Sequence, residues 1–176
     1  MSYGSLTYGF DYECNDGIGG IKPGSILITQ WDGITASNVT TAGILDSITA
    51  GTWYRYQVRK FIASDTGESV NDPMQGTVAN TSTFVFTLFN MSGSKQVQLQ
   101  LLQSKPLAVI YQDNNDKYFI LGLNYGAEAT SVARQSGKEK QEMNGYTVTI
   151  VHEDKDFPPE VDSSVVSGLT ISGELS

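Results

Sequence analysis

The sequence of 176 residues contains a single cysteine, Cys14, and a single histidine, His152. One cysteine cannot form an intrachain disulfide, so a disulfide-stabilised secreted scaffold is excluded. A structural zinc site needs four ligands, which one cysteine and one histidine do not supply. A nucleophile–histidine–acid triad would have to use His152, and no nucleophile-elbow motif is present. We therefore expect no enzymatic activity, cofactor or metal, and a hydrogen-bonded or exposed histidine at a strand end.

Positive charge is also scarce, because 11 Lys and Arg against 19 Asp and Glu give a formal net charge of −8. Nucleic-acid affinity depends largely on clustered Lys and Arg, so a surface that grips phosphates is not expected, although DNA could pass without being held. No apolar run is long enough to span a membrane, and no basic and apolar leader begins at Met1. We expect a chain that is made and used without the secretory route and has no membrane partner.

Residues that favour strands and turns are abundant, with 18 Gly and many Thr, Ser, Val, Ile and Tyr. A chain of this length with 39% hydrophobic residues can bury one sizeable core. We predict a mainly β fold, either a β-sandwich or a partly closed barrel with one flanking helix. The chain is divided into an N-terminal arm over residues 1–24 and a single β-rich domain over residues 25–176.

A β-hairpin is predicted at the centre of the chain, over Pro106 to Gly126. Its two apolar runs, 107–111 and 118–123, flank the turn formers Asp113 to Asp116, with the sequence D-N-N-D. Both runs are nearly continuous in apolar residues, which predicts that both faces are covered by the rest of the domain or by another chain. The D-N-N-D cluster lacks the spacing and the later Glu of a calcium loop, so we interpret it as turn chemistry.

Strand patterns recur along the rest of the chain. The clearest alternation is at Gly145 to Glu153, which places four side chains on one side of a strand: Tyr146, Val148, Ile150 and His152. Residues 37–51 are small and polar, and we expect them to be irregular. Other strands are predicted at 25–31, 52–63, 77–91, 127–137 and, as an edge strand, 164–172.

One helix is predicted, over Ser92 to Ser104, because Gln and Leu are good helix formers. Ser92 or Ser94 can cap its N-terminus, and Pro106 stops it. The helical period places Val97, Leu101 and Ser104 on one face, with Leu102 beside them, although Val97, Leu99 and Leu101 also alternate as in a strand.

Two segments lack a regular pattern, residues 1–24 and 64–76. Gly17 to Gly20 could suggest a phosphate-binding loop, but Pro23 and Gly24 follow where a helix should begin. We interpret residues 1–24 as an extended arm whose aromatic side chains pack on another surface. Turn-like segments longer than about 12 residues are usually functional or ordered by a partner. Residues 64–76 are therefore predicted to be a projecting loop, which with residues 77–91 forms a long hairpin whose tip leaves the body.

Arg55, Arg59 and Lys60 form one of the few cationic clusters in this acidic chain. The cluster is either a solvated strand face or a strip that pairs with the carboxylates of a neighbouring subunit. Surface charges usually contribute little, which favours the first interpretation.

The chain resembles a known family in four stretches: Gly19 to Trp31 (G-G-I-K-P-G-S-I-L-I-T-Q-W), the helix candidate, Ala108 to Gly126 and Asn144 to Glu153. In layout these are similar to tail structural proteins of bacteriophages, in particular tail-tube-like proteins of phages infecting Bacteroidetes. The resemblance implies rings, commonly hexameric, that stack around a channel through which double-stranded DNA passes without specific binding. It also implies a place in the virion tail, contacts with other tail proteins and synthesis in the host cytoplasm.

In that family a long loop or hairpin and the terminal arms reach adjacent subunits or rings, and the matching pieces here are residues 64–76 and 1–24. Together with the cationic cluster, these pieces supply our candidates for subunit contacts: Tyr3, Tyr8, Phe10, Tyr12, Arg55, Arg59, Lys60, Asp65, Glu68, Asp72 and Met74.

Other functions stay open at this point. Within the virion, the alternatives are a tail adaptor or hub and a head-decoration protein. From a different class, a carbohydrate-binding β-sandwich module would use an aromatic stacking platform made of Trp31, Trp53, Tyr54 and Tyr56. A hydrolase that uses paired carboxylates ranks third, because no pair stands out.

Overall fold

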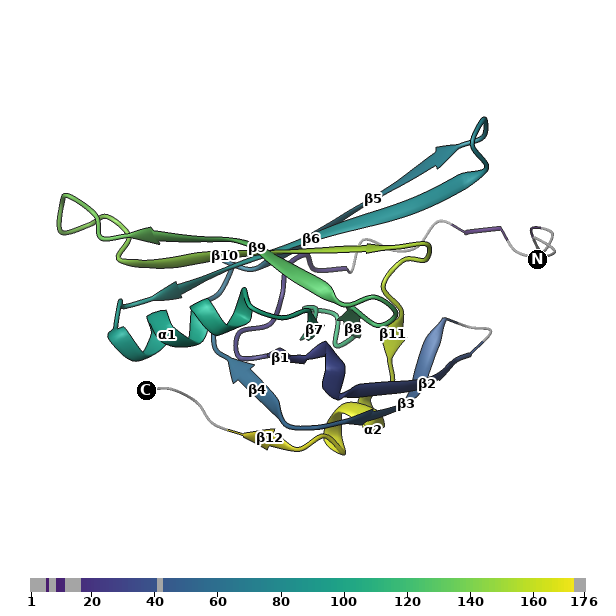
Figure 1. Ribbon diagram of the computed structural model, residues 1–176, viewed down its shortest axis with the longest axis horizontal. Coiled ribbons are helices and arrows are strands. Elements are labelled where there is room, and N and C mark those ends of the chain that lie inside the picture. Colours follow the sequence, from purple (N-terminus) through teal and green to yellow (C-terminus); the bar gives the residue numbers. More distant parts are fainter. Residues whose placement is uncertain (1–5, 7–8, 12–16, 41–42, 173–176) are drawn as a thin grey trace.

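The computed structural model describes residues 6, 9–11, 17–40 and 43–172 (Figure 1). Strands make up 49% of the chain and helices 11%, so the fold is mainly β. The strands form one strongly curled sheet that resembles half a barrel, and a helix flanks it. The predicted fold class is thereby confirmed.

The elements follow one another as strands with two short α-helices. In chain order they are β1 (Ile26–Gln30), the 3₁₀ turn η1 (Trp31–Gly33), β2 (Ile34–Val39), β3 (Ile44–Ala50), β4 (Trp53–Tyr56), β5 (Ser64–Asp72), β6 (Thr77–Phe89), α1 (Gly93–Leu102), β7 (Leu107–Gln112), β8 (Tyr118–Leu121), β9 (Ala127–Gln135), β10 (Gly145–Asp154), β11 (Glu160–Val161), α2 (Ser163–Ser167) and β12 (Ile171–Ser172).

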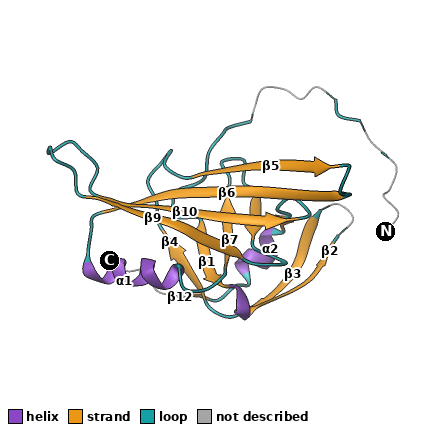
Figure 2. Cartoon of the chain, turned by 45° about the horizontal axis from the view of Figure 1, so that its top comes forward, coloured by secondary structure: helices purple, strands orange, loops and turns teal. Residues whose placement is uncertain are grey.

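The curled sheet has two well-defined parts (Figure 2). The long antiparallel strands β9, β10, β6 and β5 lie side by side in that order, and we call these four strands the ribbon. Below the ribbon lie β4, β1, β7 and β8, which we call the middle layer. Strands β11, β3 and β2 continue the sheet beyond β8, and β12 pairs with β4.

Two hydrophobic cores lie on the two faces of the middle layer. Between the ribbon, α1 and the middle layer, Val109 and Tyr111 of β7 pack with Phe84, Phe86 and other apolar side chains. On the opposite face, Ala108 and Ile110 of β7 pack with a second group that includes Leu45, Trp53, Val161 and Val166. The predicted hairpin of β7 and β8 is confirmed, and the rest of the chain covers both of its faces.

The ribbon strands alternate between buried and less buried side chains. Along β10, Tyr146, Val148, Ile150 and His152 are all buried, as the alternation predicted. Along β6, the buried positions begin at Asn80 and repeat at every second residue as far as Phe86. The ribbon therefore turns one face to the first core, and most of the other face is uncovered within the described residues, although Thr87 and Gly145 on it are buried.

Three of the segments predicted outside the β5–β6 hairpin are wrong. Residues 37–51 contain most of an antiparallel hairpin of β2 and β3, because backbone pairing outweighs the weak propensity of small polar residues. The strand expected at 52–63 ends at Tyr56, and Phe61 has a φ of 61°, which no strand tolerates. At 164–172, a one-turn helix whose N-cap is Asp162 replaces most of the expected edge strand.

The projecting loop expected at 64–76 is mostly a strand. Nine of its residues form β5 and pair in register with β6, and only Pro73 to Gly76 form the turn. Polar, Gly-containing segments have a low intrinsic β propensity, so the extended conformation of β5 depends on its pairing with the long strand β6. The predicted long hairpin that leaves the body is present, and it projects at one end of the molecule (Figure 1).

The helix α1 begins where it was predicted, since the Ser92 side chain accepts a hydrogen bond from the Lys95 amide. Its buried side chains are Leu99 and Leu102, whereas Val97 and Leu101 are about half exposed. Leu102, which lies beside the expected face, is thus buried, whereas Val97 and Leu101 on that face are not, because the position of the ribbon decides which Leu side chains are covered.

Candidate assembly surface

One face of the ribbon is open, and the strand register defines it. Side chains directly opposite each other in a ladder point to the same face of a sheet. Glu68, Thr81 and Glu153 form one such row, opposite to the buried row of Asn80 and Asp154. The open face consists of Ser64, Thr66, Glu68, Val70 and Asp72 of β5, Thr77, Ala79, Thr81, Thr83, Val85, Thr87 and Phe89 of β6, Gly145, Thr147, Thr149, Val151 and Glu153 of β10, and Glu128, Ser131, Ala133 and Gln135 of β9.

The open face is chemically uniform. Its residues are mostly Thr, Ser, Val and Ala, its charged members are Glu68, Asp72, Glu128 and Glu153, and none of them is Lys or Arg. At one end, the Cζ atom of Arg59 lies 4.7 Å from the ring centroid of Phe89. Such a surface offers anions and small hydroxyl groups to whatever faces it.

Both long edges of the ribbon lack a strand partner along most of their length in the described part of the chain. The strand order ends at β5, whose nine residues are mostly exposed. On the other side, β9 pairs with β7 only at Ala127, so the rest of its outer edge is unpaired. Unpaired edges of this length are templates for pairing with another chain, and natural proteins usually cover or block them.

The tip of the β5–β6 hairpin is a well-defined turn with an exposed apolar side chain. A carboxylate oxygen of Asp72 accepts hydrogen bonds from the amides of Met74, at 3.0 Å, and Gln75, at 3.2 Å. The Met74 side chain is 96% exposed, and Val70 and Val78 beside it are also exposed. Of the predicted contact residues, Glu68 and Met74 are thus available to a neighbour, whereas Asp72 holds the turn.

Asp65 lies at the base of the same hairpin and points toward the middle layer. The Tyr111 hydroxyl donates a hydrogen bond of 2.6 Å to the Oδ2 atom of Asp65. The buried Oδ1 atom of Asp65 has no hydrogen-bond partner within the described residues. Burial raises the pKa of the Asp65 carboxyl, and the bond from Tyr111 offsets part of this effect. Burial also raises the pKa of Tyr111, with a further contribution from Asp65. The geometry makes Asp65 an internal link between ribbon and middle layer.

A shallow hollow of about 250 Å³ lies beside this link. Gly20, Ile21, Ser64, Asp65, Tyr111, Asp113 and Phe119 line it. Within the described residues, no three His, Cys, Asp or Glu side chains gather closely enough to hold a metal ion.

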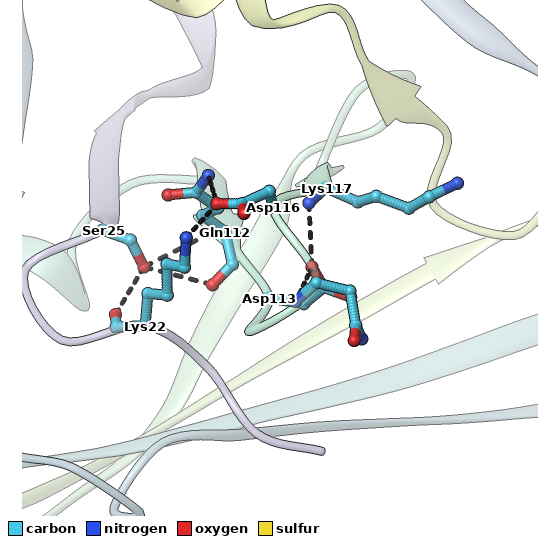
Figure 3. Close-up of polar contacts among 7 residues, drawn as sticks. Lys22, Ser25, Gln112, Asp113, Asp116 and Lys117 are labelled. Carbon is cyan, nitrogen blue, oxygen red and sulfur yellow. Dashed lines mark hydrogen bonds and ion pairs between the residues drawn. The ribbon is translucent and has the colours of Figure 1, made fainter. Parts of the chain in front are cut away.

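The D-N-N-D turn between β7 and β8 holds the arm against the body (Figure 3). The Oδ1 atom of Asp113 accepts hydrogen bonds from the amides of Asn115 and Lys117, at 3.0 and 2.8 Å. Asp116 forms an ion pair with Lys22 of the arm and accepts a hydrogen bond from Gln112. These contacts confirm the prediction of turn chemistry, because the carboxylates already accept internal donors.

The arm contacts the body only over part of its described length. The amide of Ile18 donates to the side chain of Asn115 at 2.9 Å, and Lys22 donates to the Gln112 carbonyl. Farther upstream, the side chains of Leu6 and Phe10 are fully exposed. The other predicted arm contacts, Tyr3, Tyr8 and Tyr12, lie outside the described residues.

The three cations of the predicted strip do not share one strand face. Arg55 lies in β4, whereas Arg59 and Lys60 follow the end of that strand, and all three side chains are exposed. Only Arg59 reaches the ribbon, where it stacks on Phe89. The guanidinium of Arg59 thus places positive charge at one end of the open face.

His152 is buried and hydrogen-bonded. Of the two alternatives predicted for it, hydrogen-bonded or exposed, the first is therefore confirmed. Its Nδ1 atom accepts the amide proton of Gly122 at 3.2 Å, and its Nε2 atom lies 3.9 Å from an oxygen of Asp154. Gly122 has a φ of 81° and no room for a Cβ atom, which would lie 2.4 Å from the Leu107 carbonyl oxygen. His152 therefore fixes the connection that leads from β8 to β9.

The four aromatic residues of the supposed glycan platform do not form one surface. Trp53 is fully buried, and Trp31 donates from Nε1 to the Leu123 carbonyl at 3.1 Å. Tyr56 packs edge-on against Phe86, and burial raises its pKa to about 12. Tyr54 alone is about half exposed. This arrangement argues against a stacking site built from these residues.

Sequence reasoning missed the open face and the unpaired edge of β5. A signal was present in Thr77–Phe89, where Thr81, Thr83 and Val85 alternate with the buried side chains. That period of two predicts a strand with one hydroxyl-rich face. The edge itself left no signal, because β5 is too polar and Gly-containing to stand out.

None of the known family models matches the sequence, and neither a curated protein nor a solved structure is significantly similar to the chain. Among the described residues, no helix has the length and apolar character needed to cross a membrane.

Proposed function

We propose that this chain is a structural subunit of a virion tail, which assembles into stacked rings that form a tube for double-stranded DNA. The observation that carries the proposal is the open face of the ribbon, with its hydroxyl groups, small apolar groups and carboxylates and its lack of Lys and Arg. Turned to a lumen, this face repels the phosphate backbone along most of its length, and the cation of Arg59 is confined to the end at Phe89. DNA slides along such a wall without sticking.

The two unpaired edges of the ribbon supply the way to build a ring. The strands of the ribbon alternate in direction, so β5 of one subunit meets β9 of the next as an antiparallel neighbour. Repetition of this heterologous contact around an axis closes a continuous barrel and leaves no long ribbon edge unpaired. The resemblance to tail-tube proteins implies six subunits in each ring.

The exposed arm and the hairpin tip fit the same assembly. Leu6, Phe10 and Met74 expose almost their entire side chains, which is costly for isolated apolar groups in water. In the assembly, neighbouring subunits cover them. This role would extend the resemblance, in which arms and hairpins reach adjacent subunits or rings.

The first test is the assembly state of the untagged protein, by light scattering and negative-stain electron microscopy over a range of concentrations. Rings and tubes are the expected result. A species of 19.1 kDa under all conditions would refute the proposal. Rings that never stack would indicate a tail adaptor or hub instead.

A matched pair of variants tests the ribbon edge. Val70 on β5 and Val97 on α1 are similarly exposed, at 59% and 55%, so a lysine should cost either site little stability. Val70→Lys should prevent ring formation, because a lysine on an edge strand blocks pairing with another chain. Val97→Lys should assemble like the wild type. Equal assembly of both variants would exclude β5 from the interface.

A second pair tests the lumen. Thr83→Lys with Thr149→Lys places cations on the open face, and the resulting tubes should retain duplex DNA in a nuclease-protected form. Wild-type tubes should retain none. Protected DNA in wild-type tubes at physiological salt would contradict a non-binding lumen.

A further inference from the structure

The charges of the ribbon are separated along its length. The bulge between Thr149 and Ile150 of β10 divides the ribbon into two halves. The half toward the β5–β6 tip comprises residues 64–85, 127–130 and 150–154, all of which the structure describes. Its charged residues are carboxylates without a single Lys or Arg: Asp65, Glu68, Asp72, Glu128, Glu153 and Asp154.

The other half carries positive charge. It comprises residues 86–92 and 131–149 and contains Arg134, Lys138 and Lys140 against Glu139 and Glu142. Glu139 and Glu142 offset two of these cations, so this half has a net charge of +1, against −6 for the half toward the β5–β6 tip with His152 neutral. Two more cations reach this half from outside.

Those two additional cations both contact Phe89 at the end of β6. The Nζ atom of Lys95 donates to the Phe89 carbonyl at 3.2 Å, and the guanidinium of Arg59 lies over the ring. Positive charge therefore gathers around the end of the ribbon from which the β9–β10 hairpin leaves.

The two hairpin tips lie at opposite ends of the longest axis of the molecule (Figure 1). We call Glu68, Asp72 and Glu153 the acidic end, and Arg134, Lys138 and Lys140 the cationic end. Of these residues only Asp72 is half-buried, and the other five are exposed. A molecule with opposite charges at its two ends attracts another copy in one orientation and repels it in the other.

We propose that the acidic end of one copy docks on the cationic end of the next, head to tail along the long axis. This inference rests on the proposed function and deepens it, since it assigns the contact between successive rings and gives the tube a direction. Contacts between like ends would place like charges together, which costs affinity. A heterologous contact along an axis extends without limit, as stacking requires.

Charge exchange between the two ends provides the test. One variant reverses the acidic end by Glu68→Gln, Asp72→Asn and Glu153→Lys, which keeps the turn cap and adds no lysine to the edge strand β5. The other reverses the cationic end, by Lys138→Glu and Lys140→Glu. A control with Asp46→Lys and Thr49→Lys changes exposed residues of β3, which lies outside the ribbon. Circular dichroism and thermal melts establish that each variant folds.

Each end variant alone should form rings but need about tenfold more protein to form tubes, which corresponds to a few exposed ion pairs lost. A mixture of the two variants should form tubes near the wild-type concentration, because each presents the end that the other lacks. The control should behave like the wild type. Wild-type tubes should also shorten as salt rises to about 1 M, where charges are screened beyond about 3 Å.

The outcomes separate this inference from the function on which it rests. If the wild type forms no rings, both fail together. If the wild type forms tubes and both end variants form them equally well, the proposed function stands and the head-to-tail charge contact is refuted. Failure of the mixture to recover tubes, with both variants folded, would also refute it.

Discussion

The hairpin of β7 and β8 and the ribbon are both antiparallel, but they differ in how their two faces are covered. Every residue of β7 from Leu107 to Tyr111 is buried, because hydrophobic cores lie on both of its faces. In β6 and β10 of the ribbon, by contrast, buried side chains alternate with small hydroxyl side chains on an open face. The hairpin is enclosed between the two cores, whereas most of one face of the ribbon is left open by the described residues.

The two regions differ in what a substitution can disturb. In the middle layer, any change of volume meets packed atoms on either face, since protein interiors are close-packed. On the open face of the ribbon, apart from Thr87 and Gly145, the same change meets solvent in the isolated chain. Stability should therefore depend on the first region, and assembly on the second.

The largest difference is expected between two glycines with similar backbone angles. Gly122, at the junction of middle layer and ribbon, has a φ of 81°, and Gly76, at the ribbon tip, has a φ of 66°. Gly122→Ala should cost about 4 kcal/mol or more, because backbone strain adds to a collision with the Leu107 carbonyl. Gly76→Ala has open space around it and should cost about 1 kcal/mol. Urea unfolding of both variants measures the difference, and equal costs would contradict it.

A matched pair of aliphatic truncations tests the same contrast through packing. Ile110→Ala should lower the free energy of unfolding by about 3 kcal/mol, since it leaves a cavity in the second core. Val70→Ala removes a side chain that is 59% exposed and should change it by no more than about 0.5 kcal/mol. Thermal and urea melts of both variants provide the measurement. A comparable loss for Val70→Ala would mean that the ribbon edge is covered in the isolated subunit.

The link between the two regions should be sensitive to pH. Burial raises the pKa of Asp65 above its ordinary 3.8, so the folded chain keeps this proton to higher pH than the unfolded chain. The free energy of unfolding thus falls as pH rises through the folded pKa. The Asp65→Asn variant lacks this titration and should gain stability relative to the wild type as the pH rises above 3.8, the ordinary pKa of the carboxyl. A difference in stability that stays constant as the pH rises would show that Asp65 does not titrate in this way.

The smallest effect is expected on the open face. Glu68 of β5 and Glu153 of β10 lie in one row, with Thr81 of β6 between them. Their two strands are therefore about 10 Å apart. Neutralising both, by Glu68→Gln and Glu153→Gln, should raise the free energy of unfolding by less than about 0.5 kcal/mol. Salt at about 1 M should abolish the gain, because it screens the repulsion. A gain that survives high salt would point to a cause other than charge.

Some elements could be predicted because a local pattern was strong. The apolar runs of β7 and β8 around their D-N-N-D turn, the alternation of β10 and the Ser92 cap of α1 all appear where they were expected. Weak local patterns failed, as in β5 and the β2–β3 hairpin, because pairing with a neighbouring strand supplied the order that propensity did not.

The candidate surface could be predicted only in part. Glu68 and Met74 were expected at a projecting segment and are exposed there, but Asp65 turned inward to Tyr111. No local rule distinguishes these outcomes, because the carboxylates of Asp65 and Glu68 differ only in which face of β5 they occupy and in what lies below it.

The sequence by itself determined that the chain is mainly β, acidic, without disulfides and organised around one apolar hairpin, because composition and short-range periodicity express these properties directly. Only the tertiary structure decided which strands share the ribbon, which of their faces stays open and how the charges separate toward opposite ends. Those properties depend on register between segments far apart in the chain, and register follows from which side chains each strand buries in the two cores.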